Sequence, residues 1–226
     1  MLLLVTDTSG RNGSVALARA GEDSEVELIE AGQLAGGTFS AQLVPQVATL
    51  IEKHGVRKTD VGAFVVVSGP GSFTGLRVGL AAIKALAEIL QKPIVPVSLL
   101  EVVALASGTD GRVMAALDAG RGDVYAGEYL VAGESAQAKR EQLLSKEEFL
   151  GQARGMLVAT PDPVLAEAAR DAGLPVFRLD SVSSEMIARL GWRKLRAAET
   201  ISPEELDANY IRRTDAEIFS EPASSS

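Results

Sequence analysis

Apolar residues in the first half of the chain form short runs at its start and longer stretches with helical spacing further on. The first two runs flank Asn12-Gly13, a dipeptide typical of a two-residue β-hairpin turn. Two later stretches carry apolar residues every three or four positions, which indicates helices. The predicted order is strands over 2–5, 15–18 and 26–29, a helix over 40–54, a strand over 63–67, a helix over about 74–91, a short strand between Pro93 and Pro96, and a helix from Ser98.

Two of these helices carry further signals near their starts. Pro45 falls within about the first turn of the 40–54 helix, where proline is tolerated. Glu101 follows Ser98 by three positions, and this spacing predicts a capping box at the third helix.

The second half repeats the opening of the first. Its apolar run over 113–117 ends at Asp118, passes through Gly120-Arg121 and returns over 124–130. The first run of the chain likewise ends at Asp7, before a Gly-Arg pair and a returning run. Beyond the second hairpin we expect a strand near 156–159, a helix over about 162–172, a strand at Val176 and a helix over 183–198.

Strand meanders followed by alternating helices and strands, used twice, predict a duplicated α/β fold of two lobes, each with a mixed sheet and flanking helices. The actin-like ATPase superfamily is similar in organisation, with an aspartate at the first hairpin of each half near the nucleotide phosphates. The alternative is a coincidental likeness between two hairpins. The duplication predicts an N-terminal lobe over 1–108, a C-terminal lobe over 109–216 and a disordered tail over 217–226.

A glycine-rich turn over 68–79 joins the 63–67 strand to the long helix. Such a turn can bind phosphate at a helix N-terminus, but this one lacks the Gly-Lys-Ser/Thr end of a P-loop and the glycine spacing of a Rossmann fingerprint. No serine stands centrally in Gly-x-Ser-x-Gly, which excludes a nucleophile elbow. Two interpretations remain, a phosphate-binding turn or a tight turn in which Ser72 or Thr74 caps the helix.

The helix over about 74–91 is apolar or small on nearly every side. Its polar residues follow one narrow stripe, whereas a surface helix needs an apolar arc of only about 100°. Gly75, Gly79 and Ala82 would let another helix come close. The 40–54 helix is also apolar on more than one side. Either both helices are enclosed within one domain, or their second faces contact another molecule.

Charge and composition narrow the possible chemistry. The 226 residues include no cysteine and one histidine, which excludes disulfides, thiolate sites and His-pair metal sites. The net charge of −8 has the same sign as the phosphates of nucleic acid, whereas a protein that binds nucleic acid on its own normally carries a basic surface. No apolar stretch approaches the ~20 residues that span a bilayer, and the first residues lack the basic region of a secretory signal. We therefore expect a cytoplasmic protein that does not enter a membrane.

Two turns carry residues that could meet Mg²⁺ and phosphate between the lobes. They are Asp7-Thr8-Ser9 and Asp118-Ala-Gly. The same residue types are common in ordinary hairpin turns. Because the segment over 158–163 lacks the Gly-Gly turn that usually backs adenosine in actin-like ATPases, we interpret these turns as a vestigial nucleotide site.

The remaining polar candidates have ordinary explanations beside functional ones. His54, near a helix end, is expected to be a capping or surface residue, and a serine triad through it has no supporting motif. Arg189, Arg193 and Arg196 follow one face of the last long helix. They form either a solvated face that complements the helix C-terminus or a contact with RNA or a partner.

Several segments together resemble the TsaB (YeaZ) family. The matches occur in the expected order across nearly the whole chain, and the long glycine signature is specific. Phe39 departs from the pattern, since many relatives carry His there. The matching segments are Asp7-Thr-Ser9, Phe39–Pro45, Val66–Gly79, Leu117–Tyr125 and Tyr210-Ile-Arg212.

The resemblance implies an actin-like fold and a non-catalytic subunit of the machinery that makes threonylcarbamoyladenosine beside the tRNA anticodon. The implied partners are the paralogue TsaD, which transfers the threonylcarbamoyl group, the ATPase TsaE and a second copy of the chain, with tRNA bound only indirectly. No metal or cofactor is implied for the chain alone, and ATP or ADP with Mg²⁺ belongs to the complex. The implied partner contact comprises Leu43, Val44, Val47, Gly71, Ser72, Thr74, Gly75, Arg77, Leu80 and Ile83.

Two rival functions stay open. One is a small actin-like kinase that uses Asp7 and Asp118 around Mg-ATP. The other is a hydrolase with Ser72 or Ser68 as its nucleophile.

Overall fold

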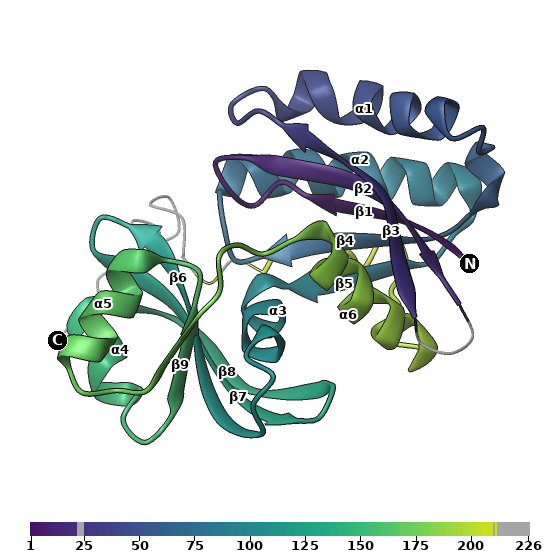
Figure 1. The fold of residues 1–226 in the computed structure, drawn as a ribbon. Helices are drawn as coiled ribbons and strands as arrows, with labels where there is room; N and C mark the ends of the chain where they lie inside the picture. The colour runs from purple at the N-terminus through teal and green to yellow at the C-terminus, as the bar shows by residue number, and fades with distance from the viewer. Residues whose placement is uncertain (22–24, 210, 212–226) are drawn as a thin grey trace, which may run out of the picture.

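Two five-stranded mixed sheets with the same strand order form the framework of the computed structural model, which describes residues 1–21, 25–209 and 211 (Figure 1). The first sheet has the order β3-β2-β1-β4-β5. Its first three strands pair antiparallel, and β4 and β5 are added in parallel. These strands are β1 (Leu2–Asp7), β2 (Gly13–Ala20), β3 (Val26–Leu34), β4 (Val61–Gly69) and β5 (Ile94–Ser98).

The second sheet repeats this arrangement, with the order β8-β7-β6-β9-β10 and the same strand directions. The predicted duplicated α/β fold is therefore confirmed. The strand β8 was not predicted, because it is an edge strand whose residues are mostly polar and exposed. The strands are β6 (Gly111–Gly120), β7 (Asp123–Ala132), β8 (Ser135–Ser145), β9 (Leu157–Thr160) and β10 (Val176–Arg178).

The helices also fall into two equivalent sets of three. In each half the first two helices cover one face of that half's own sheet. The short helix α4, like β8, was not predicted. The helices are α1 (Phe39–Lys53), α2 (Phe73–Leu90) and α3 (Leu99–Ala106) in the first half, and α4 (Lys146–Gln152), α5 (Pro163–Asp171) and α6 (Ser184–Arg196) in the second, with a short 3-10 turn, η1 (Lys58–Asp60), before β4.

The last helix of each half packs on the sheet of the other half. Ile187 and Leu190 of α6 are buried against the first sheet, on the face opposite α1 and α2 (Figure 1). Leu100 and Val103 of α3 are buried against the second sheet. The two lobes therefore share their cores, although their sheets lie on either side of residue 108 in the sequence.

Two predicted helix-start features differ in the structure. Ser98 makes no side-chain cap on α3, and its hydroxyl donates instead to Glu141 Oε1 at 2.5 Å. Glu101 pairs with Lys194, so the predicted capping box is wrong. Pro45 lies in the second turn of α1, where both it and Ala41 are exposed. Water can bond the Ala41 carbonyl that the missing proline N–H leaves without an intrahelical donor.

Some predictions fall on residues that the structure does not describe. These are the tail over 217–226 and, within the Tyr210-Ile-Arg212 match, Tyr210 and Arg212. Among the described residues, no helix combines the length and the hydropathy needed to cross a bilayer.

Candidate functional site

The two hairpin aspartates occupy equivalent places at the ends of β1 and β6, and each closes its own turn. Asp7 Oδ1 accepts hydrogen bonds from the Ser9 N–H at 2.9 Å and the Ser9 hydroxyl at 2.6 Å. Asp118 Oδ1 accepts one from the Gly120 N–H at 2.9 Å. Burial raises the pKa of the Asp7 carboxyl, although the bonds from Ser9 oppose the shift. Both carboxylates therefore serve as turn residues in this structure.

The glycine-rich turn is bonded to the first hairpin. The Ser72 N–H donates to the Ser9 carbonyl at 2.6 Å, and Ser72 Oγ accepts from the Gly75 N–H at 3.3 Å. The interpretation of Ser72 as the helix cap is therefore confirmed, whereas Thr74 lies within the first turn of α2.

Two glycines of this turn and helix pack against Thr8. A Cβ at Gly75 would collide with the Thr8 carbonyl, and a Cβ at Gly79 would collide with the Thr8 hydroxyl. The predicted approach of another helix is seen at Gly75, which Phe39 of α1 contacts, but at Gly79 the space is filled by Thr8 of the first hairpin. Phe39, buried at the start of α1, lies against Gly75 as well and completes this contact.

A cleft of about 440 Å³ lies between the lobes, where the strand-to-helix turns of both halves face the first hairpin. Asp162 caps α5 there through bonds from the Val164 and Leu165 N–H groups, as Ser72 caps α2. Among the described residues, no group of three or more His, Asp or Glu side chains is placed to hold a metal ion. The cleft is lined by Ser9, Gly10, Arg11, Pro70, Gly71, Leu99, Leu117, Asp118, Tyr125, Pro161, Asp162 and Pro163.

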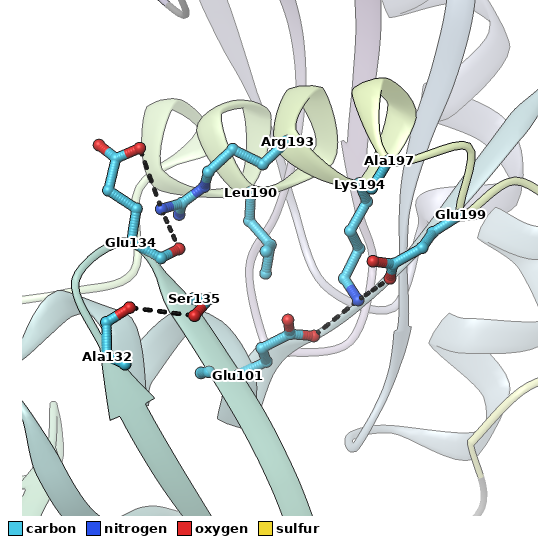
Figure 2. A pocket seen from close by; sticks show the side chains of 10 residues that line it. Glu101, Ala132, Glu134, Ser135, Leu190, Arg193, Lys194, Ala197 and Glu199 are labelled. Atoms are coloured by element: carbon cyan, nitrogen blue, oxygen red, sulfur yellow. Dashed lines mark hydrogen bonds and ion pairs between the residues drawn. The ribbon is translucent and has the colours of Figure 1, made fainter.

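A second groove, of about 420 Å³, lies beside α6 (Figure 2). Lys194 Nζ is 3.1 Å from carboxylate oxygens of both Glu101 and Glu199. Arg193 donates to the Glu134 carbonyl and lies 3.9 Å from its carboxylate. Burial raises the pKa of Glu101, and Lys194 opposes that shift. The charges that line this groove are therefore paired with one another within the chain.

The predicted arginine stripe is also paired in part. Arg189 forms an ion pair with Glu185 at 2.7 Å, and Arg193 is held by Glu134. These pairs favour the interpretation of a solvated helix face over that of a phosphate-binding surface. His54 bonds the Glu30 carboxylate at 2.8 Å at the end of α1, in keeping with the expected surface role.

Four of the expected partner-contact residues belong to the core of the chain itself. Leu43, Val47, Leu80 and Ile83 are buried between α1, α2 and the first sheet. They are unavailable to a partner, so this part of the prediction is corrected. Sequence periodicity could not show which side of each two-faced helix points inward.

The opposite side of α1 and α2 is exposed and carries few charges. Val44 on α1 is 53% exposed, and Arg77 on α2 lies with its guanidinium carbon 3.9 Å from the centre of the Phe73 ring. We call this surface the α1–α2 outer face. It comprises Ser40, Ala41, Val44, Pro45, Ala48, Thr49 and Glu52 on α1 and Phe73, Thr74, Arg77, Ala81, Ala85, Glu88 and Ile89 on α2, so its exposed charges are Glu52, Arg77 and Glu88.

The second lobe supplies an internal comparison for this surface. Helices α4 and α5 hold the same positions relative to their sheet as α1 and α2. Their exposed residues include Lys146, Glu147 and Glu148 on α4 and Glu167, Arg170 and Asp171 on α5. The equivalent helices of the second lobe thus have the charged surface expected of solvent-facing helices, whereas the longer α1–α2 outer face carries fewer charges.

Comparisons with known proteins found matches to proteins of tRNA threonylcarbamoyladenosine biosynthesis. A family model described as TsaD, tRNA N6-adenosine threonylcarbamoyltransferase, matches residues 33–185. The tRNA threonylcarbamoyladenosine biosynthesis protein TsaB of Bacillus subtilis is 37% identical over 131 residues, which is 57% of this chain and 55% of that protein. The TsaB protein of Escherichia coli is 33% identical over 133 residues, with the same two coverages. The chain thus spans about half the length of the curated relatives it matches.

The solved structure of YeaZ from Pseudomonas aeruginosa extends the likeness to the whole fold. It has a TM-score of 0.73 and 25% sequence identity, and the alignment covers 92% of this chain and 99% of that one. The similarity therefore includes both sheets and not only the segment matched in sequence.

Proposed function

The chain belongs to the TsaB (YeaZ) family, and from this premise we propose that it is a non-catalytic subunit in the biosynthesis of tRNA threonylcarbamoyladenosine. In this proposal it binds the transferase TsaD and supports threonylcarbamoyl transfer to the adenosine next to the anticodon. The observation that carries the proposal is the sparsely charged α1–α2 outer face.

This outer face has the composition of a protein contact. Of the six large apolar side chains exposed among the described residues, Val44, Phe73 and Ile89 lie on it. Arginine and aromatic side chains are enriched where interfaces bind most tightly, and Arg77 with Phe73 forms such a pair. A helical face of this kind suits helix-against-helix packing with TsaD. In the absence of TsaD, two copies of the chain would bind each other through this same face. The homodimer and the heterodimer with TsaD would therefore exclude each other.

The other components belong to the complex in this proposal. TsaE joins the TsaD pair, and ATP or ADP with Mg²⁺ binds at the level of the assembly. The net charge of −8 and the ion pairs of Arg189 and Arg193 favour indirect contact with tRNA. The chain then acts in the same compartment as tRNA, the cytoplasm.

The rival functions receive less support from the geometry. A kinase would use Asp7 and Asp118 on Mg-ATP, yet each carboxylate accepts hydrogen bonds within its own hairpin. A hydrolase would need a general base at its serine, yet Ser72 Oγ accepts from a helix N–H and Ser68 Oγ lies 3.4 Å from the Val97 carbonyl as a donor.

Reconstitution with TsaD of the same organism tests the proposal. We expect the purified chain to show neither threonylcarbamoyl transfer nor ATPase activity, to co-purify with TsaD, and to raise transfer by TsaD when the adenylate donor and TsaE are present. Turnover by the chain alone that is lost on Asp7→Ala would support the kinase instead. Failure to bind TsaD would remove the proposed role.

A further inference from the structure

A half-buried carboxylate connects three separate segments where the two lobes meet. Glu141 lies on β8 of the second sheet. Its Oε1 accepts hydrogen bonds from the Ser98 hydroxyl at the end of β5 and from the Tyr129 hydroxyl on β7, and its Oε2 accepts from Asn209 Nδ2 at 2.6 Å. Burial, followed by the charge of Glu141, raises the pKa of the Tyr129 hydroxyl, so that it remains a donor.

The segment that contains Asn209 runs from the end of α6 along the first lobe and reaches Glu141 of the second lobe. After α6, the Ile201 N–H donates to the Ile94 carbonyl at 2.9 Å, beside the edge strand β5. Leu206 is fully buried in the core that α1 and α2 share with the first sheet. We call residues 199–209 the return segment. It attaches to the core through Leu206 and to the second lobe through Asn209.

Asn209 also contacts the start of the glycine-rich turn. Its N–H donates to the Ser68 carbonyl at 2.8 Å. Gly69 has a φ of 144°, and a Cβ there would lie only 2.7 Å from the Asn209 carbonyl oxygen. The return segment thus supports this turn from one side, while the bond from the Ser72 N–H to the Ser9 carbonyl holds it on the other. The first residue of α2, Phe73, follows directly.

We propose that Glu141 is a positioning residue that holds the return segment in place and, through Asn209, fixes the glycine-rich turn and the first turn of α2. The second lobe thereby sets the geometry of a surface that belongs to the first. The consequence for partner binding rests on the proposed function, because Phe73, Thr74 and Arg77 lie in that first turn or just after it. The structural link does not depend on the partner.

A carboxylate placed opposite Glu141 tests the link. Asn209→Asp removes the donor and sets two acceptors against each other, with almost no change in side-chain shape. Adding Glu141→Gln gives an amide that donates to the introduced carboxylate and an oxygen that still accepts from Ser98 and Tyr129. Glu141→Gln alone should be mild, since the Asn209 amide can turn over to accept from it. Asn12→Asp, at an exposed hairpin turn where aspartate is equally suited, is the matched control.

Hydrogen–deuterium exchange of the isolated full chain is the first readout. In Asn209→Asp we expect the amides of residue 209, Ser72 and Gly75 to exchange about tenfold faster after correction for global stability, a size set by the loss of one charge-assisted hydrogen bond. In the double variant the exchange rates of these amides should return to within about threefold of the wild-type rates. In the control, Asn12→Asp, they should equal the wild-type rates. Should Asn209→Asp fail to fold, Asn209→Ala, which removes the donor without repulsion, replaces it.

Affinity for TsaD is the second readout. Asn209→Asp should weaken the affinity for TsaD by about tenfold, as for the exchange rates, and the double variant should restore the wild-type affinity. Wild-type exchange in the single variant, or no recovery in the double variant, would overturn the inference. If the exchange results hold but the wild-type chain does not bind TsaD, the proposed function fails and the structural link stands.

Discussion

At the residue scale, the glycine signature is explained by contacts within the chain. Gly75 and Gly79 leave room for Thr8, and Phe39 lies over the same contact. The sequence shows the glycines plainly, but Thr8 lies far away along the chain, in the first hairpin. For that reason the pattern predicted close packing correctly and could not identify the neighbour. The contact between Glu141 and Asn209 could not be predicted either, because the two residues are distant in sequence and no local pattern distinguishes them from surface residues.

Replacing Gly75 by alanine tests this packing. Gly75→Ala should lower the free energy of unfolding by about 1–3 kcal/mol, because the added methyl group collides with the Thr8 backbone. The control is Gly151→Ala in α4, where a Cβ meets no atom within 4 Å. Alanine there should be neutral or stabilising by up to about 1 kcal/mol. Urea unfolding measures both changes, and equal values for the two variants would contradict the packing account.

The desolvated carboxyl of Asp7 predicts a particular pH dependence. Because burial raises its pKa in the fold, the stability that Asp7 contributes is fully present below its unfolded pKa, about 3.9, and is lost as pH rises through the folded pKa. Asp7→Asn keeps an oxygen that accepts from Ser9 and carries no charge. At pH 7 the variant should be at least as stable as the wild type, and the difference should shrink towards pH 4. The prediction would be refuted if the unfolding free energy of Asp7→Asn, minus that of the wild type, were smaller at pH 7 than at pH 4.

At the element scale, periodicity predicted most of the helices and strands to within a few residues. It missed β8 and α4, since a polar edge strand and a helix of two turns leave little apolar pattern. It identified α1 and α2 as helices with two apolar sides, but it could not show which side of each helix faces the core. The structure assigns Leu80 and Ile83 to the core and Ala81 to the exposed side of α2.

Charge substitutions on α2 check this orientation. Leu80→Glu or Ile83→Glu places an unpaired charge in the core, at a cost on the order of several kcal/mol, which is comparable with the whole stability of a domain. Both variants should lose cooperative thermal unfolding. Ala81→Glu, on the neighbouring exposed position, should melt close to the wild type. A folded Ile83→Glu protein, monitored by circular dichroism, would mean that α2 is turned the other way.

At the scale of the whole molecule, two equivalent lobes exchange their last helices and differ in the surface that they present. Helices α1 and α2 leave an outer face with few charges, whereas α4 and α5, in the equivalent positions, are charged. Duplication alone accounts for the shared framework. The difference between the two surfaces is what the proposed partner role explains, and it required the structure, because only the folded chain shows which apolar residues stay exposed.

The most direct test measures binding of TsaD to two matched variants. Val44 is 53% exposed on α1, and Val164 is 62% exposed on α5, in the charged surface of the second lobe. Both Val44→Glu and Val164→Glu should fold with near-normal melting, since neither side chain is in the core. If the α1–α2 outer face binds TsaD, Val44→Glu should weaken binding at least about tenfold, because the new charge loses its water at the interface. Val164→Glu should bind like the wild type, and wild-type affinity in a folded Val44→Glu variant would contradict the partner-subunit account.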